Sequence, residues 1–558
     1  MEKMTGARAI AEMFQGYGVS HVFMVPAALR MSLAEMERRT NIVALQTHGE
    51  KAAAYMADGY ARATGKPGIC MAQVVGALNL AAGLRDAYLA HSPVIAMTGG
   101  RDPRTKFRQV YQEIDDVPGF GPVTKFNATV DAVERIPDMV RQAFREATSG
   151  TPGPVHLQFR GNEAQLDQET AELSPSVDAH FGKVPPFRPE PELRHVQAAL
   201  EALQSAEKPV IVAGGGVHVS GAGAELVRLA EMLQIPVATS LNGKDTIPAS
   251  HPLSVGVVGT YSRESANRIV AAADLVCFIG SQTGGMTTHF WAVPKIGIPA
   301  IQIDIEGSAL GRNYPLKAAV LGDAKATLAL MLKHTNGASA ERRKRWVESA
   351  QTIRKEWYDK FQPLMESEAV PARPERICGE LNRHMPDDAI VLADTGHAGM
   401  WMGGFFDVRG KQSYIRSAGS LGWAFSAGIG AKCACPDRPV VVFTGDSGFW
   451  YHIGEIETAM RAGANLITVV NNNHSGNQSL PGFDRAYGGK STEKARELWA
   501  FRKVNFARIA EEMGAIGVRI ENPGEIAPAF KKALSAKGPV VLEVITDIGA
   551  FAPLAVRE

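Results

Sequence analysis

Short apolar runs alternate with helix-like stretches along almost the whole chain. The runs are rich in β-branched residues and bounded by turn residues, as in the buried strands of parallel sheets. In the stretches between them, apolar residues recur at helical spacing. Between Phe449 and Ala462, for example, Ile453, Ile456 and Met460 fall on one stripe and predict a helix. The alternation predicts an α/β protein built from doubly wound parallel sheets.

The predicted strands form three groups, which predicts domains at residues 1–165, 190–335 and 370–558. A polar stretch containing several prolines, Gly161 to about Glu192, reads as a linker, and a charged helical stretch, Ala340–Phe361, precedes the third group. The first residues, from Met1, are predicted to start an amphipathic helix. The predicted strands are His21–Val25, Ile42–Thr47, Gly68–Val75, Val94–Thr98, Val155–Phe159, Pro209–Ala213, Val237–Thr239, Leu275–Ile279, Ala300–Asp304, Ala389–Ala393, Val440–Phe443, Leu466–Val470 and Val540–Val544.

Composition and charge narrow the class of protein. The 558 residues are 45% apolar, and 59 basic residues nearly balance 58 acidic ones. This balance gives no electrostatic reason to expect nucleic acid or a membrane as a partner. Five cysteines, no signal-peptide pattern and no apolar run of membrane-spanning length indicate a cytoplasmic enzyme.

The strongest chemical signal follows two neighbouring predicted strands. Gly445-Asp446-Ser447 follows one strand, and Asn471-Asn472-Asn473 follows the next. Since the carboxyl ends of parallel strands meet at one edge of a sheet, we expect these side chains to lie close together. A carboxylate and an amide oxygen suit Mg²⁺, and the helix after Asp446 adds N–H donors for phosphates.

A second signal is Glu50, which follows the strand Ile42–Thr47 and starts a predicted helix, Glu50–Ala63. Alone it is typical of an acidic residue favoured by the helix macrodipole. Together with the Asp446 motif, however, the chain resembles the thiamine-diphosphate-dependent enzymes of the acetolactate synthase, oxalyl-CoA decarboxylase and 2-hydroxyacyl-CoA lyase group. The resemblance covers essentially the whole chain and also the order of its three units, in which a pyrimidine-binding domain and a diphosphate-binding domain flank a Rossmann-like one.

The resemblance implies a site for thiamine diphosphate (ThDP) and Mg²⁺ shared between two subunits. Glu50 would hydrogen-bond the pyrimidine ring of the cofactor. Asp446, Asn473 and the Ser475 carbonyl would hold the metal, while Leu421 would wedge the two cofactor rings into a V. The other residues implied in cofactor binding are Pro26, Ala27, Gly396, His397, Gly419, Gly445, Ser447 and Gly448.

Residues near the substrate are implied less specifically. Gln112 matches a polar contact to the reacting carbonyl, and His48, His397 and His474 are each candidate proton shuttles or ordinary polar residues. Of these, Gln112 and His48 join Glu50 as predicted catalytic residues. The apolar tail Gly549–Leu554 is either a lid or a passively packed segment.

The middle domain carries a glycine cluster, Gly214–Gly216, after its first strand, and Asp304 ends another. Such glycines are a weak nucleotide signal or simply a tight turn. The resemblance implies that this domain holds FAD, the ADP part of coenzyme A, or nothing.

Two departures bear on the reaction. The segment Gly280–Met286 lacks the arginine that acetolactate synthases carry there, and Ser447 gives the GDS form found in the coenzyme-A branch. Without a guanidinium, recognition of a second carboxylate is harder to explain. We therefore lean towards a 2-hydroxyacyl-CoA lyase, which releases formyl-CoA and an aldehyde or ketone reversibly. An acetolactate-forming transferase acting on pyruvate, a 2-oxo acid or oxalyl-CoA decarboxylase, and a cofactor-binding protein without turnover stay open.

The resemblance also implies a homo-oligomer. Glu50 and Asp446 would come from different chains at each site, so a dimer is the minimum, and a homotetramer is the expectation. The substrate would be an acyl-CoA or a 2-oxo acid.

Overall fold

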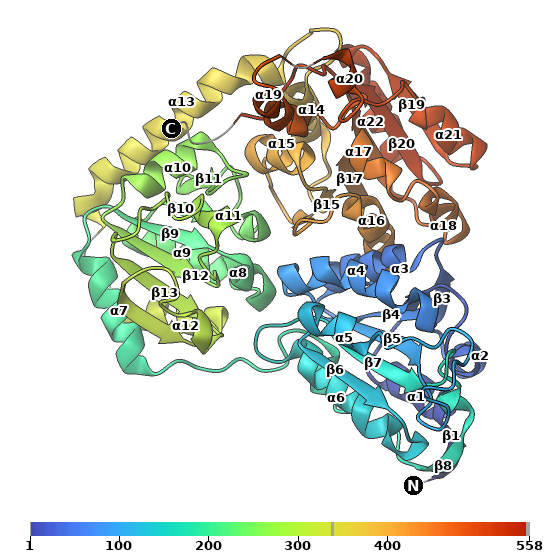
Figure 1. The fold of residues 1–558 in the computed structure, drawn as a ribbon. Helices are drawn as coiled ribbons and strands as arrows, with labels where there is room; N and C mark the ends of the chain where they lie inside the picture. Colours follow the sequence, from blue (N-terminus) through green and yellow to red (C-terminus); the bar gives the residue numbers. More distant parts are fainter. Residues whose placement is uncertain (1, 336–339, 491, 554–558) are drawn as a thin grey trace.

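Three parallel sheets of six strands each, with helices on their faces, form the computed structural model (Figure 1). The structure describes residues 2–335, 340–490 and 492–553. In Figure 1 the three sheets surround a common centre, with the N-terminal unit in blue and cyan, the middle unit in green, and the C-terminal unit in orange and red. The predicted fold class, three doubly wound α/β units, is therefore confirmed.

The first and third sheets share one strand order. The first runs β3-β2-β4-β5-β7-β6 and the third runs β16-β15-β17-β18-β20-β19. Numbered within its own unit, each order is 2-1-3-4-6-5. The strands are β2 (His21–Met24), β3 (Val43–Gln46), β4 (Gly68–Ala72), β5 (Val94–Gly100), β6 (Phe126–Val130), β7 (Val155–Arg160), β15 (Ile390–Ala393), β16 (Ser413–Arg416), β17 (Val440–Gly445), β18 (Ile467–Asn472), β19 (Ile516–Ile520) and β20 (Val540–Ile545).

The middle sheet follows a different order, β11-β10-β9-β12-β13-β14. This is the 3-2-1-4-5-6 order of dinucleotide-binding folds, in which the direction of winding reverses between the first and fourth strands. Its strands are β9 (Pro209–Ala213), β10 (Val237–Thr239), β11 (Ser254–Val257), β12 (Leu275–Ile279), β13 (Ala300–Asp304) and β14 (Leu316–Leu321).

Helices connect the parallel strands in all three units. They are α1 (Gly6–Gly16), α2 (Arg30–Arg39), α3 (Glu50–Thr64), α4 (Val74–Ala90), α5 (Val117–Phe120), α6 (Ile136–Thr148), α7 (Leu193–Ser205), α8 (Gly215–Ser220), α9 (Gly223–Leu233), α10 (Glu264–Ala271), α11 (Gly285–Thr288), α12 (Ala324–His334), α13 (Lys344–Met365), α14 (Pro374–His384), α15 (His397–Phe405), α16 (Trp423–Ala434), α17 (Asp446–Trp450), α18 (Glu455–Arg461), α19 (Leu480–Ala486), α20 (Glu493–Arg496), α21 (Phe506–Glu512) and α22 (Ile526–Leu534). None of the helices among the described residues is long and apolar enough to cross a membrane.

Four local predictions were wrong. The predicted helix Phe449–Ala462 is two short helices, α17 and α18, and the predicted strand Gly68–Val75 ends at Ala72 because α4 already begins at Val74. The predicted linker folds back on the first unit, where β8 (Thr170–Leu173) pairs antiparallel with β1. That strand, Glu2–Thr5, replaces the first turn of the predicted N-terminal helix.

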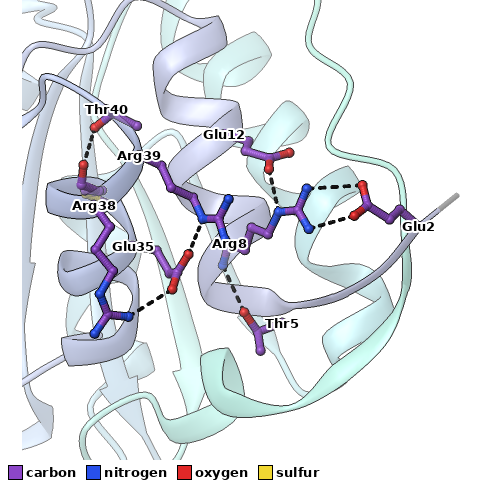
Figure 2. A network of polar contacts seen from close by, with 9 residues as sticks. Glu2, Thr5, Arg8, Glu12, Glu35, Arg38, Arg39 and Thr40 are labelled. Atoms are coloured by element: carbon purple, nitrogen blue, oxygen red, sulfur yellow. Dashed lines mark hydrogen bonds and ion pairs between the residues drawn. The ribbon is translucent and has the colours of Figure 1, made fainter.

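Polar contacts at the edge of the first unit fix the entry into α1 (Figure 2). The Thr5 hydroxyl accepts a hydrogen bond from the Arg8 N–H, a typical helix cap. The Arg8 guanidinium reaches both Glu2 and Glu12 at 2.7 Å. On the neighbouring α2, Glu35 pairs with Arg39. Such exposed pairs add only about 0.2–1 kcal/mol each, so the cap and the buried face of α1 hold this edge.

The first and third units meet where α3 crosses α16. Two glycines allow the close approach: a Cβ on Gly59 would overlap the carbonyl of Ala427, and a Cβ on Gly430 would overlap that of Met56. Apolar side chains of α3 and α16 join one hydrophobic core that spans both units. The two units therefore pack as one body through backbone contact.

Gly430→Val is expected to destabilise this crossing by about 3 kcal/mol or more, because the new side chain forces two helix backbones apart. The measurement is the thermal unfolding midpoint. Gly524→Val is the matched control, since no atom lies within 4 Å of a Cβ there. An equal midpoint for both variants would contradict the close-packed crossing.

The middle and third units are joined by buried cations that cap α15. Lys244 Nζ donates to the carbonyl oxygens of Met402 and Gly403 at 3.0 and 2.6 Å. The Arg263 side chain donates to the carbonyl oxygen of Gly404 at 2.9 Å. Cations at a helix C-terminus offset its partial negative charge. Since α15 begins at His397, these contacts help to place a predicted site residue.

Candidate functional site

The Asp446 motif lies at the carboxyl edge of the third sheet, as predicted. β17 ends at Gly445, so Asp446 starts α17, and β18 ends at Asn472. Asp446 Oδ2 accepts a hydrogen bond from the Ser475 N–H at 2.9 Å. Asn473 Oδ1 accepts from the same N–H at 3.0 Å. The three residues predicted as magnesium ligands are therefore gathered around one backbone N–H.

The donor set of this site suits a hard cation. It offers one carboxylate, one amide oxygen and main-chain carbonyls, all oxygen ligands of the kind that Mg²⁺ prefers. Asp446 is 3% exposed, and burial raises its pKa to about 6. A bound divalent cation would favour the ionised carboxylate and offset this cost. Among the described residues no cluster of three or more His, Cys, Asp or Glu competes as a metal site.

Not every backbone N–H group near Asp446 that was predicted to bind phosphate is available for it. The Ser447 N–H donates to Asp446 Oδ1 at 2.6 Å and so already has a partner. Gly448 is needed for packing, since a Cβ there would lie 2.7 Å from Asp394 Oδ2. α17 is five residues long. The predicted phosphate contacts of Gly445, Ser447 and Gly448 stay a prediction, with one donor, the Ser447 N–H, engaged within the chain.

Asp394 is a buried residue of this site that the sequence analysis missed. Its carboxylate accepts hydrogen bonds from the N–H groups of Thr395 and Gly422 and from the Thr444 hydroxyl. Burial raises the pKa of Asp394 to about 6. The contacts tie the start of α15 to the loop before α16. An aspartate directly after the predicted strand Ala389–Ala393 was the available signal.

Gly396 and His397 follow Asp394 after one residue, Thr395. Gly396 has a φ of 67°, a left-handed conformation that favours glycine. His397 Nδ1 lies 3.1 Å from Asn477 Oδ1, and burial lowers the pKa of the imidazole. The Asn477 amide in turn donates to the carbonyl oxygens of Ile548 and Ala550. His397 is therefore fixed from the side of the C-terminal segment.

That segment packs on the third unit up to the last described residues. Ala550 and Ala552 are buried in its core, and Phe551 meets the His397 ring edge-on, with centroids 5.7 Å apart. Leu554, the last residue of the predicted lid, lies outside the described residues. The contact with His397 makes Phe551 the residue through which the segment reaches the predicted site.

Phe551→Ala is expected to raise the KM for the substrate about threefold to tenfold, the size of one lost aromatic contact. The thermal midpoint should change little, because Phe551 is 36% exposed. Steady-state kinetics is the measurement. Phe187→Ala is the control, an exposed Phe that stacks on His180. Passive packing of the tail predicts an unchanged KM in both variants.

Glu50 begins α3 beside a notch in α4. Its Oε2 accepts a hydrogen bond from the Asn79 amide at 3.3 Å. A Cβ on Gly76 would lie 2.3 Å from the other carboxylate oxygen, so a larger residue there would displace the Glu50 side chain from its present position. The stretch Val74–Asn79 therefore provides both the space that Glu50 occupies and the amide that it accepts from.

Glu50 and Asp446 make their polar contacts in different places within the chain. Glu50 contacts α4, whereas the Asp446 carboxylate contacts the loop after β18. Leu421 lies at a cavity of about 490 Å³ that is also bordered by Lys51, the neighbour of Glu50, and by Tyr451. A shared site for Glu50 and Asp446 stays a prediction that needs a second chain.

His48 is tied to α18. Its Nε2 lies 2.8 Å from Glu457 Oε2, and its N–H donates to Glu455 Oε1 at 3.0 Å. Glu455 is buried and also accepts a hydrogen bond from Thr458. The sequence analysis did not single out Glu455, which holds the turn before Glu50 in place. The catalytic role of His48 stays a prediction.

The remaining predicted residues lie on loops. Gln112 has a φ of 63°, and its Oε1 accepts from the Gln73 amide at 3.1 Å. Pro26 and Ala27 follow β2, where the Ala27 N–H donates to the Val25 carbonyl. The exposed Lys125 donates through its Nζ to three carbonyl oxygens around the end of α6, those of Glu146, Ser149 and Thr151.

A cavity of about 640 Å³ borders the middle unit at the point where its winding reverses, and residues of the first unit, such as Ala61–Gly65, line its other side. Gly214–Gly216 after β9 and Gly280–Gln282 after β12 line it, and a Cβ on Gly214 would overlap the Gly280 carbonyl. Asp304 borders the cavity, as does Arg62 from the end of α3. The predicted nucleotide signals thus lie around one space.

Comparison with known proteins agrees with this architecture. Models of the thiamine pyrophosphate enzyme family match in the expected order: the N-terminal TPP binding domain at residues 4–118, the central domain at 196–331 and the C-terminal TPP binding domain at 394–544. The matches cover the whole middle sheet and most strands of the other two, with β6, β7 and β15 outside the matched residues.

Full-length relatives carry related names. A probable acetolactate synthase large subunit of Methanocaldococcus jannaschii is 32% identical over 99% of this chain and 93% of its own length. An acetolactate synthase large subunit of Lactococcus lactis is 29% identical over 98% and 93%. A glyoxylate carboligase of Escherichia coli O157:H7 is 30% identical over 98% and 94%. The chain belongs to the thiamine-diphosphate-dependent enzymes of the acetolactate synthase family.

Proposed function

We propose that this protein is a ThDP- and Mg²⁺-dependent carboligase, which decarboxylates a 2-oxo acid and joins the remaining acyl unit to a second carbonyl compound. The observation that carries the cofactor part is the gathering of Asp446 and Asn473 oxygens around the Ser475 N–H. Relatives named acetolactate synthase and glyoxylate carboligase support the carboligase part.

Different residues of the chain would bind the metal and diphosphate, hold a proton at the pyrimidine ring, and face the substrate. When bound, ThDP supplies a carbon nucleophile and an electron sink next to a carbonyl. Asp446, Asn473 and the Ser475 carbonyl would hold Mg²⁺ and, through it, the diphosphate. Glu50 would hold a proton at a ring nitrogen of the pyrimidine, with its carboxylate steered by Asn79. His397 would face the reacting carbonyl from the side of the C-terminal segment.

The proposed site is completed by a second copy of the chain, with Glu50 from one subunit and Asp446 from the other. This makes a dimer the smallest active form and a tetramer the proposed assembly. For the cavity of the middle unit we propose a nucleotide ligand, namely FAD or the ADP part of coenzyme A. The glycines Gly214–Gly216 and Gly280 line this cavity where the strand order reverses, which is where dinucleotide-binding folds hold their ligand.

A 2-hydroxyacyl-CoA lyase is the second candidate, and one segment of the middle unit favours it. At the end of the segment Gly280–Met286, which lacks the arginine, Met286 is 37% exposed. Phe290, four residues later, is 66% exposed. His289, Phe290 and Trp291 all have positive φ values, which holds this segment in an unusual turn. The exposed side chains of Met286 and Phe290 offer no guanidinium that could pair with a second carboxylate.

One assay separates the candidates. Purified protein with ThDP and Mg²⁺ is given pyruvate or glyoxylate in one arm, and formyl-CoA plus an aldehyde in the other. The carboligase predicts CO₂ and a hydroxy-keto acid or semialdehyde in the first arm only. A 2-hydroxyacyl-CoA in the second arm alone would replace the proposal by the lyase, and CO₂ with a free aldehyde would indicate a plain decarboxylase. A flavin absorbance band in the purified protein would identify the ligand of the middle unit.

A further inference from the structure

A buried carboxylate from the first unit holds a loop of the third. Asp86 lies on α4 and is fully buried. Its Oδ1 accepts hydrogen bonds from the Ser420 N–H at 2.9 Å and the Ser417 hydroxyl at 3.1 Å, and its Oδ2 accepts from the Ala418 N–H at 2.9 Å. Three donors of one short loop thus converge on a side chain more than 300 positions earlier in the sequence.

Besides Asp86, few contacts shape the loop. The Ser417 hydroxyl also contacts the Ser420 carbonyl and the Gly419 N–H, and the Ser417 N–H donates to the Ala393 carbonyl. The loop joins β16 to α16 and contains Gly419 with a φ of 156° and Gly422 with a φ of 84°. Its far end is held by Asp394, which accepts from the Gly422 N–H. Without Asp86, the N–H groups of Ala418 and Ser420 would lose their acceptor, and an unpaired donor in a partly buried loop is costly.

The charge of Asp86 has a nearby counterpart. Arg62 Nη1 lies 4.0 Å from Asp86 Oδ2 and 3.8 Å from Asp58 Oδ2. The same guanidinium sits over the Trp423 ring at 5.0 Å. Arg62 offsets the cost of burying two carboxylates between the units.

We propose that Asp86 is a positioning residue for the cofactor, which acts by fixing the loop that carries Gly419 and Leu421. The proposal rests on the proposed ThDP function only for what the loop does. That Asp86 fixes the loop is independent of any cofactor, and the two parts have separate readouts.

Asp86→Asn tests the first part. The amide keeps one acceptor oxygen but turns an NH₂ group towards a loop donor. Hydrogen–deuterium exchange in the cofactor-free protein is expected to speed up in the peptide that covers residues 417–421. Asp58→Asn is the matched control, because Asp58 is equally buried and shares Arg62 but accepts from Trp423 Nε1 and not from the loop. Unchanged exchange in Asp86→Asn, or equal acceleration in both variants, would overturn the proposal.

ThDP binding tests the second part, followed by tryptophan fluorescence at saturating Mg²⁺. Asp86→Asn is expected to raise the Kd of ThDP about tenfold, which corresponds to about 1.4 kcal/mol, and excess ThDP should restore kcat. Faster exchange with an unchanged Kd would overturn the cofactor role and leave the proposed function intact. If wild type itself fails to bind ThDP, the proposed function and the cofactor role fall together.

Ser417→Ala keeps the test decisive if Asp86→Asn does not fold. It removes the hydroxyl contact to Asp86, together with that hydroxyl's contacts to the Ser420 carbonyl and the Gly419 N–H, and leaves the carboxylate and both N–H groups that it accepts from in place. The same two changes are expected, in the same direction and smaller. No change in either readout in a folded Ser417→Ala protein would then count against the proposal.

Discussion

Glu50→Gln is expected to lower kcat about a thousandfold, within the range that a positioned acid or base contributes. Glutamine has the shape of glutamate and can still fill the notch at Gly76 and accept from Asn79, but it cannot carry the proton that the pyrimidine ring needs. The second measurement is deuterium exchange at the thiazolium C2 of added ThDP, which should slow by a similar factor.

Glu264→Gln is the matched control for Glu50→Gln. Glu264 also begins a helix, α10, so both changes remove one carboxylate from a first turn. The control should keep its kcat and its C2 exchange rate. If Glu50→Gln retained full activity, the assignment of Glu50 would be wrong, and with it the proposed division of labour between subunits.

Asp446→Asn is expected to weaken Mg²⁺-dependent ThDP binding by at least about 100-fold. Changes to residues that only orient a metal ligand cost about 10- to 100-fold in metal affinity, and the loss of a charged ligand itself should exceed this. Titration calorimetry of ThDP with and without Mg²⁺ measures the effect. The difference between the two titrations should largely disappear in the variant.

Asp167→Asn controls for the loss of a buried carboxylate. Asp167 is 1% exposed and accepts from Ser32, within the first unit and away from the predicted metal site. Its Mg²⁺-dependent gain in ThDP affinity should match that of the wild type. A normal gain in Asp446→Asn would contradict the metal site at the edge of the third sheet.

The residue pattern alone predicts only the part of the candidate site that lies in the third unit. Asp446 and Asn473 follow two neighbouring strands, and the rule that parallel strands end at one edge of a sheet predicted that they lie close together. Ser475 was implied only by the family resemblance. Glu50 gained meaning only by its combination with that motif. Asp394 and Asp86 were missed, because an acidic residue near a strand end or on a helix is common, and its role depends on which distant donors the fold turns towards it.

The hydrophobic pattern alone predicts the central strands of each sheet and the order of the three units. Central strands are covered on both faces, so they read as continuous apolar runs. The missed parallel strands, β6, β11, β14, β16 and β19, all lie at sheet edges. β14, for example, alternates between buried and exposed positions, so its pattern is weak. The edge strands, the crossing at Gly59 and Gly430, and the hydrogen bonds of Asp86 to the loop before α16 emerge only in the folded protein. Each of them depends on contacts between segments that lie far apart in the chain.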